Sequence, residues 1–183
     1  MSKPIHWLGI SGSLRKASNN TGLLRAAQNV LPEGVQLDIA NLDFIPFFNA
    51  DVNERPAAVQ TLFDQLEQAD ALVLACPEYN YSLAPALKNA LDWASRYPDN
   101  ALLKGKAVAI VSAGGGMGGS RAQYHLRQVC VYLDLHPLNK PEVFARSFAN
   151  EFDAQGNLID DKVKANLAEQ MRALAKLSAQ LKT

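Results

Sequence analysis

The first polar loop of the chain combines residue types that bind anions. It offers three hydroxyl groups and a guanidinium that can pair with two phosphate oxygens, carried by Ser11, Ser13, Ser18 and Arg15. An apolar run precedes the loop and a helical pattern follows it, and the N-terminus of a helix attracts anions. We expect Asn20 or Thr21 to cap that helix. The loop predicts a phosphate cradle, with an ordinary polar turn before a capped helix as the alternative.

A second polar loop, which begins at Pro77, follows another apolar run and suits a flat heterocycle. Pro77 stiffens the exit from the strand, Tyr79 can lie against a planar ring, and Asn80 with backbone amides can bind a pyrimidine edge. Glu78 and Tyr81 could contact the same ligand, solvate the loop or join a subunit contact. Together the two loops predict a nucleotide-like cofactor such as FMN.

A third loop is rich in glycine, and its residues Gly114, Gly116 and Gly119 fit the pattern G-x-G-x-x-G. In dinucleotide-binding folds that pattern belongs to the first strand–helix turn, whereas here it lies in the fourth unit. We therefore expect backbone amides to approach the N1 and C2 carbonyl edge of a flavin, from Ala113, Gly114, Gly115 and Gly116. A loose turn is the alternative. A nicotinamide dehydrogenase without flavin is supported by these glycines alone.

Short apolar runs alternate with helical patterns along the chain, which is typical of parallel α/β folds. Five strands are expected, at Ile5 to Ile10, Val35 to Ala40, Ala71 to Ala75, Ala107 to Ser112 and near Leu135 to Leu138. The first two polar loops follow strands one and three, and ligands of open α/β sheets bind where the strand order reverses. We predict one domain, residues 1–183, folded as a flavodoxin-like three-layer sandwich with a five-stranded parallel sheet in the order 2-1-3-4-5.

Apolar residues recur at helical spacing between these runs, and a last helix is expected from about Asp160 to Leu181. Two long connections, Leu42 to Pro56 and Pro137 to Gly156, each contain three phenylalanines. Long connections in compact domains tend to be functional or to lie at interfaces. Their phenylalanines fit burial against a partner subunit as well as they fit capping of the domain's own core.

The composition limits the partners of the protein. Its 183 residues contain 18 Lys plus Arg and 18 Asp plus Glu, so no global field attracts nucleic acid or an anionic membrane. Cys76 and Cys130 are too few for a disulfide framework and are interpreted as small apolar residues in a reducing compartment. The three histidines lack the spacing of metal ligands, so no metal is expected. Because no apolar run is long enough to span a membrane, we expect a cytoplasmic protein.

The chain contains three distinct motifs: Gly12-Ser13-Leu14-Arg15-Lys16-x-Ser18-x-Asn20, Pro77-Glu78-Tyr79-Asn80-Tyr81-Ser82 and Leu87-Lys88-Asn89-Ala90-Leu91-Asp92-Trp93. Together they closely resemble the NADPH-dependent FMN reductase family, particularly its quinone- and chromate-reducing members. The resemblance extends from Ile5 to about Glu142. It implies a flavodoxin-like fold, noncovalent FMN, NADPH or NADH as hydride donor, and a homodimer or homotetramer with the flavin near a subunit interface.

The same resemblance assigns roles to individual residues. The phosphate would be held by Ser13, Arg15, Ser18 and Asn20, and the flavin would be lined by Pro77, Glu78, Tyr79 and Asn80. Candidates for an interface network are Tyr81, Arg121, Tyr124 and Glu142. The glycine loop departs from the family pattern, because relatives often carry a hydroxyl at the matching position.

The predicted function is an FMN-dependent oxidoreductase that takes a hydride from NADPH or NADH and passes electrons to quinones. Chromate and other small acceptors would be side activities. No catalytic residue of the protein is predicted, because the flavin performs the chemistry. A flavodoxin-type electron carrier and a flavin-based redox sensor without nicotinamide turnover are the alternatives. His125 could touch substrate, or it could be a plain surface or interface residue.

Overall fold

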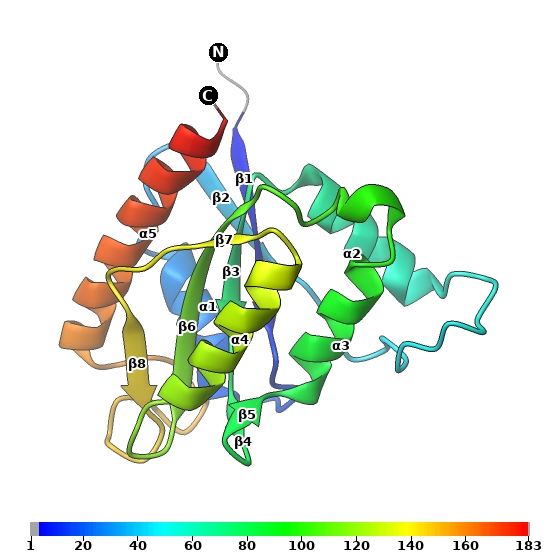
Figure 1. Ribbon diagram of the computed structural model, residues 1–183. Coiled ribbons are helices and arrows are strands. Elements are labelled where there is room, and N and C mark those ends of the chain that lie inside the picture. The colour runs from blue at the N-terminus through cyan, green and yellow to red at the C-terminus, as the bar shows by residue number, and fades with distance from the viewer. Residues whose placement is uncertain (1–3, 183) are drawn as a thin grey trace.

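Figure 1 shows a computed structural model of the chain, in which residues 4–182 are described. Strands and helices alternate as the apolar patterns predicted. In chain order, the elements are β1 (Ile5–Ser11), α1 (Asn19–Gln28), β2 (Val35–Ile39), α2 (Ala57–Gln68), β3 (Ala71–Ala75), β4 (Glu78–Tyr79), β5 (Ser82–Leu83), α3 (Pro85–Ala94), a short 3-10 helix (Pro98–Asn100), β6 (Ala107–Gly114), α4 (Ser120–Tyr132), β7 (His136–Pro137), β8 (Val143–Arg146) and α5 (Asp161–Leu181).

The main sheet is parallel throughout. Its first strand lies between β2 and β3, with Trp7 beside Leu37 on one side and Ala71 on the other. The strand order is β2-β1-β3-β6-β7, and β8 also pairs with β6. This order is the predicted 2-1-3-4-5, because β4 and β5 form a separate small hairpin. All the central strands therefore end at the same edge of the sheet.

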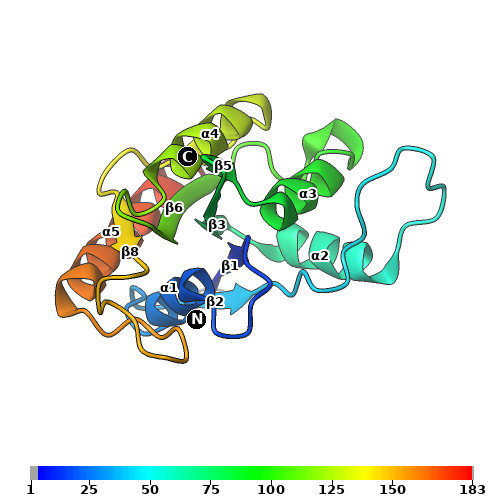
Figure 2. The same cartoon turned by 90° about the horizontal axis from the view of Figure 1, so that it is seen from below.

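Helices cover both faces of the sheet, as the view along the strands shows (Figure 2). On one face, α2, α3 and α4 bury apolar side chains that include Leu66, Leu87 and Leu126. On the other face, α1 and α5 bury Leu24 and Met171. Strands covered on both faces need apolar residues at every position, which explains the unbroken apolar sequence of β3. The three-layer arrangement leaves the strand ends free to carry polar loops.

The last helix, α5, begins where the sequence predicted. Its N-cap, Asp160, accepts a hydrogen bond from the backbone N–H of Val163 at 2.8 Å. Leu167, Met171 and Leu174 form the buried stripe that packs against the sheet. Among residues 4–182, no helix combines the length and the apolar content needed to cross a membrane.

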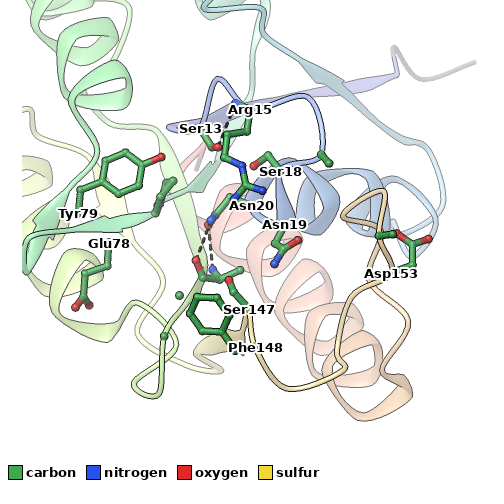
Figure 3. Close-up of a pocket in the computed structure, with 16 residues that line it drawn as sticks. Ser13, Arg15, Ser18, Asn19, Asn20, Glu78, Tyr79, Ser147, Phe148 and Asp153 are labelled. Carbon is green, nitrogen blue, oxygen red and sulfur yellow. Dashed lines mark hydrogen bonds between the residues drawn. The ribbon is translucent and has the colours of Figure 1, made fainter.

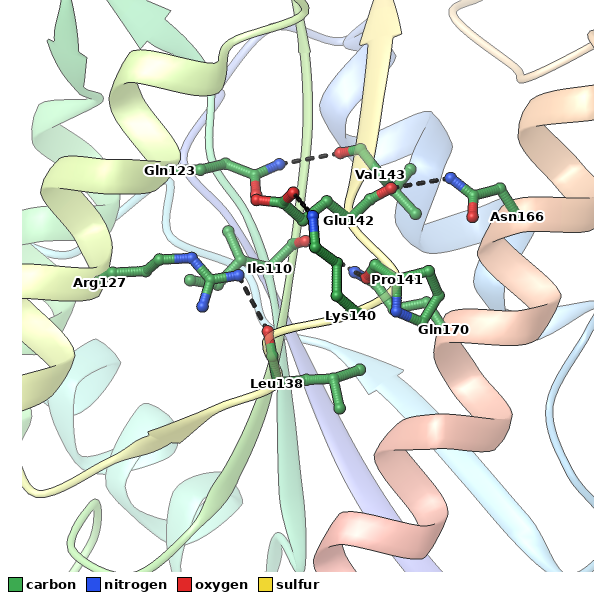
Figure 4. Close-up of polar contacts among 10 residues, drawn as sticks. All are labelled: Ile110, Gln123, Arg127, Leu138, Lys140, Pro141, Glu142, Val143, Asn166 and Gln170. Atoms are coloured by element: carbon green, nitrogen blue, oxygen red, sulfur yellow. Dashed lines mark hydrogen bonds and ion pairs between the residues drawn. The ribbon is translucent and has the colours of Figure 1, made fainter.

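The fifth position of the sheet is more complex than the single short strand predicted near Leu135 to Leu138. There β7 contains only two residues, and after an interruption β8 resumes pairing with β6. Pro141 lacks an N–H and cannot extend the ladder. Side chains from the helices on both faces satisfy the carbonyls around this break (Figure 4). The side chains of Gln123 and Arg127 donate to the carbonyls of Val143 and Leu138, respectively. The side chain of Gln170 donates to the carbonyls of both Ile110 and Pro141.

The phenylalanines of the first long connection differ in their burial. The Phe48 ring packs edge-on against Trp93, with ring centroids 5.1 Å apart, and so covers the domain's own core. By contrast, Phe44 and Phe47 are each 80% exposed. Capping of the core therefore applies to Phe48, and burial of Phe44 and Phe47 against a partner subunit stays a prediction.

Both cysteines are buried and unpaired. Cys76 lies at the exit from β3, and Cys130 lies in α4. Burial raises the pKa of each thiol to about 12. The thiols therefore remain protonated at neutral pH and behave as small apolar side chains, as predicted.

Candidate functional site

A cavity of about 410 Å³ lies at the carboxyl ends of β1, β3 and β6 (Figure 3). Its volume is within the range of small-molecule and cofactor pockets. Most of the predicted site residues line it, namely Ser13, Arg15, Ser18, Asn20, Pro77, Glu78, Tyr79, Ala113, Gly114 and Gly115. The other predicted residues do not line it, and they are Ser11, Thr21, Asn80 and Gly116.

The loop between β1 and α1 forms the first wall of the cavity. Ser18 caps α1, because its hydroxyl accepts a hydrogen bond from the backbone N–H of Thr21 at 3.2 Å. The prediction that Asn20 or Thr21 would be the cap was wrong. Ser18 has the extended backbone that a cap requires, whereas Asn20 and Thr21 already belong to the first turn of the helix. Ser18 and Asn19 line the cavity, so the N-terminus of α1 faces it, and a helix N-terminus favours an anion.

Ser11 and Thr21 lie behind this wall. The Thr21 hydroxyl donates to the Ser11 hydroxyl oxygen at 2.9 Å, and the backbone N–H of Ser13 donates to the same oxygen at 3.3 Å. Ser11 is buried. Both residues thus support the loop from within, and their contact with a phosphate stays a prediction.

Among the described residues that line the cavity, Arg15 alone supplies positive charge. Figure 3 shows Arg15 extending into the cavity, and within residues 4–182 its guanidinium forms no ion pair with a carboxylate. Asp153 also lines the cavity, but its oxygens accept hydrogen bonds from Asn157 and Gln155. The backbone N–H of Asn157 is the main cause that lowers the pKa of Asp153. The guanidinium, the Ser13 hydroxyl and the helix N-terminus together suit a phosphate group.

Asn20 connects the first wall to the glycine loop. Its Nδ2 donates to the carbonyl of Ala113 at 2.9 Å, and its Oδ1 accepts from the N–H of Ala113 at 3.0 Å. The side chain is buried, and the two bonds pair it with β6 much as a neighbouring strand would. This role positions the two loops relative to each other, and direct contact of Asn20 with a phosphate stays a prediction.

The second wall is a β-hairpin rather than the irregular loop expected from Pro77 to Ser82. Strands β4 and β5 pair, and the two residues between them, Asn80 and Tyr81, have positive φ angles of 50° and 67°. This is the conformation of a type I′ turn, which asparagine tolerates at its first central position. Asn80 therefore has a structural role at the turn, and its contact with a pyrimidine edge stays a prediction.

An ion pair holds this hairpin against α4. Arg121 Nε donates to Glu78 Oε1 at 2.7 Å, and the backbone N–H of Arg121 donates to the other carboxylate oxygen at 3.2 Å. The same guanidinium lies 3.8 Å from the ring centroid of Tyr81. Glu78 is thus engaged within its own chain, which leaves Tyr79 as the side chain of the hairpin that faces the cavity (Figure 3).

The glycine loop supplies a wall made of backbone. A Cβ atom at Gly114 would lie 2.7 Å from the backbone nitrogen of Gly119, so the close turn requires glycine there. At Gly115 a Cβ atom would have no neighbour within 4 Å, because that face of the loop is open. The open face of Gly115 leaves room for a flat ligand, and the contact of this backbone with a flavin edge stays a prediction.

A buried polar chain supports the loop from behind. The Ser112 hydroxyl donates to the carbonyl of Gly118 at 2.6 Å and accepts from Nε2 of Gln123 at 2.8 Å. Ser112 and Gln123 are both fully buried. Helix α4 therefore takes part in setting the conformation of the glycine loop.

Sequence reasoning missed the wall that follows β8. The backbone N–H of Ser147 donates to the carbonyl of Gly114 at 2.7 Å, which places this segment beside the glycine loop. The residues missed are Ala17, Asn19, Ser147, Phe148, Asp153 and Ala154. Because β8 was not predicted, the rule that sites lie at strand ends did not indicate Ser147 or Phe148.

His125 does not line the cavity. Its Nδ1 lies 3.1 Å from the hydroxyl of Ser82, at the exposed surface between the hairpin and α4. In the described part of the chain, residues 4–182, no three His, Cys, Asp or Glu side chains come together in a way that could hold a metal ion.

Comparison with known proteins finds matches over most of the chain. Residues 5–150 match the NADPH-dependent FMN reductase family. An NAD(P)H-dependent FMN reductase of Pseudomonas aeruginosa is 50% identical over 177 residues, which cover 95% of each chain. The quinone reductase of Escherichia coli is 39% identical over the full length of both chains.

A solved structure shows the same fold. The flavoenzyme NAD(P)H:(acceptor) oxidoreductase from Paracoccus denitrificans superimposes with a TM-score of 0.86, at 28% identity, covering 96% of this chain and 98% of that one. The flavodoxin-like fold predicted from the sequence is confirmed. A family match over most of the chain, the full-length relatives and the cavity all agree: this chain belongs to the NADPH-dependent FMN reductase family.

Proposed function

We propose that the protein is an FMN-dependent oxidoreductase that uses NAD(P)H to reduce quinones, and that FMN binds in the cavity at the strand ends. The observation that carries this proposal is the division of the cavity into two chemically different ends. One end holds the N-terminus of α1 and the unpaired Arg15. The other end holds Tyr79 and the open backbone of Gly115.

The residues present fit FMN. A phosphate monoester needs several hydrogen-bond donors and positive charge, which Ser13, Arg15 and the first turn of α1 offer. A flat ring needs an aromatic neighbour and a wall without side chains, which Tyr79 and Gly115 offer. The names of the relatives, FMN reductase and quinone reductase, support the same cofactor and acceptor.

In this proposal the residues of the protein bind and orient the cofactor. Bound FMN supplies the redox chemistry, since it can accept a hydride from a nicotinamide and pass two electrons to a quinone. Ser13 and Arg15 would hold the phosphate, while Asn20 keeps the first loop and the glycine loop together through Ala113. Across the whole cycle one NAD(P)H and one proton convert one quinone to one quinol. No acid or base side chain is needed to balance that sum.

The experiment is an anaerobic absorption spectrum of the purified protein. We expect the visible bands of FMN, their loss on addition of NADPH, and their return on addition of a quinone. A colourless preparation that FMN cannot reconstitute would contradict the proposal. Retained colour that NADPH does not bleach would instead identify a flavodoxin-type carrier.

We also propose a homodimer or homotetramer located in the cytoplasm, with chromate as a further acceptor. Exposed apolar side chains on the hairpin and α4 support the assembly, and these are Tyr81, Tyr124, Val131 and Tyr132. Light scattering behind size-exclusion chromatography measures the mass of the particle. A particle of 19.9 kDa, the mass of one chain, would contradict the assembly.

A further inference from the structure

Phe148 is the most exposed large apolar side chain among the described residues, at 91%, and it lines the cavity. Exposure alone carries no weight, because single apolar side chains are common on protein surfaces. The position of Phe148 on a cavity wall is what distinguishes it from Phe44 and Phe47, which are also exposed but lie outside that cavity.

The loop that carries Phe148 is anchored on both sides of the ring. Just before it, Ser147 donates its N–H to the carbonyl of Gly114 at 2.7 Å. Just after it, the buried carboxylate of Glu151 accepts from the N–H of Arg146 at 2.6 Å and from Nε of Arg146 at 2.9 Å. These bonds therefore fix the backbone that carries the ring in a structured turn beside the cavity, at the end of the sheet.

The ring also lies at the end of the cavity that suits planar groups. Figure 3 shows Tyr79 on the hairpin wall and Phe148 on the wall after β8. The hydrogen bond between Ser147 and Gly114 connects the glycine loop to the wall that follows β8. Arg15 and Ser13, which suit a phosphate, belong to the loop after β1. Phe148 therefore lines the cavity next to the glycine loop, on the side away from the loop after β1.

We propose that Phe148 is a specificity-determining residue, whose ring stacks on planar aromatic electron acceptors and so favours quinones over small inorganic acceptors. This inference rests on the proposed function, because the acceptor reacts only when FMN is in place. The proposed contacts with FMN are made by Ser13, Arg15, Tyr79 and Gly115, so we expect FMN retention not to require the Phe148 ring. Aromatic pairs gain from stacking beyond the area that they bury.

The test compares the holoenzyme with Phe148→Ala and Phe148→Tyr, with Phe47→Ala as a control for loss of an exposed ring outside the cavity. At saturating NADPH, kcat/KM is measured for 1,4-naphthoquinone and for ferricyanide. We expect Phe148→Ala to lower kcat/KM for naphthoquinone about 3- to 10-fold and to leave ferricyanide unchanged. Phe148→Tyr should restore the wild-type ratio, and Phe47→Ala should match the wild type.

A second measurement is independent of turnover. Binding of 2-naphthol, which the enzyme cannot reduce, is followed by the change that it causes in the flavin absorption bands. Its Kd should rise by a similar factor in Phe148→Ala and stay unchanged in Phe148→Tyr.

Three results would overturn the inference. Equal losses with both acceptors would show that the ring has no part in selection. A weaker Kd for FMN in Phe148→Ala would assign the ring to the cofactor, and a change in particle mass would assign it to a subunit contact. If the wild type retains no FMN or is not reduced by NADPH, the proposed function fails instead, so the two failures are distinguishable.

Discussion

Among the described residues that line the cavity, Arg15 alone carries positive charge. A hydrogen bond to a charged group contributes about 1.5 to 3 kcal/mol, so Arg15→Ala should raise the Kd for FMN about 10- to 150-fold. The Kd of Arg15→Lys for FMN should lie between those of the wild type and Arg15→Ala, because lysine keeps the charge and loses the planar guanidinium. Fluorescence titration of apoprotein with FMN measures the effect. Arg172→Ala, an exposed change on α5, serves as the control, and an Arg15→Ala protein that binds FMN as tightly as this control would refute the assigned contact.

Gly115 offers a sharper test at the same scale, because its Cβ position is open whereas that of Gly114 is closed. Gly115→Val should leave the free energy of unfolding within about 0.5 kcal/mol of wild type, as is usual for surface positions, while flavin affinity and the rate of reduction by NADPH decline. Gly114→Ala should instead destabilise the fold, because the new atom meets the backbone of Gly119. Urea unfolding and stopped-flow reduction separate the two effects. Normal reduction kinetics in Gly115→Val would mean that no ligand approaches this backbone.

At the level of elements, the caps of α1 and α5 form a matched pair. Ser18 accepts from Thr21 N–H, and Asp160 accepts from Val163 N–H. Replacing either by alanine should lower the free energy of unfolding by about 1 kcal/mol. Only Ser18→Ala should also weaken FMN binding, since only α1 begins at the cavity. Chemical denaturation and FMN titration of both variants give the comparison. Equal FMN affinities of the two variants would show that the N-terminus of α1 does not contribute to FMN binding.

Periodicity predicted the elements that form the core, because β3, β6 and the buried helical stripes are long enough for burial to dictate their sequence. It did not predict the hairpin at Asn80 and Tyr81, where a positive-φ turn occurs without glycine. Nor did it predict β8, a strand of four residues that follows Pro141 and pairs with β6. The site followed the same rule: residues directly after predicted strands were found, while Ser147 and Phe148 depend on tertiary pairing that no local spacing encodes.

For the molecule as a whole, Asp70 joins the C-terminal end of the chain to the amino ends of the strands. Its carboxylate pairs with Lys182 and accepts from the N–H of His6 at 2.9 Å. Burial opposes ionisation, but the hydrogen bonds from Lys182 and His6, with the charge of Lys106 nearby, lower the pKa of Asp70 below its ordinary 3.8.

Because the folded pKa of Asp70 is lowered, its stabilisation is present above the unfolded pKa and is lost as the pH falls through the folded value. Asp70→Asn should therefore reduce the free energy of unfolding by about 1 kcal/mol at pH 7. The difference in the free energy of unfolding between Asp70→Asn and the wild type should become smaller below about pH 4. Denaturation curves from pH 2 to 7 measure it, with the exposed change Asp51→Asn as control. A difference that is constant with pH would contradict the ion pair.

The break between β7 and β8 bears on the tendency of the protein to aggregate through this edge of the sheet. A free sheet edge can recruit further strands and seed fibrils when it offers a continuous row of backbone donors and acceptors. Here β7 contains two residues and β8 four, and Pro137 and Pro141 supply no N–H. Between the strands, the carbonyls of Leu138 and Pro141 already accept hydrogen bonds from helix side chains. The interruption thus protects this edge against aggregation during synthesis and storage.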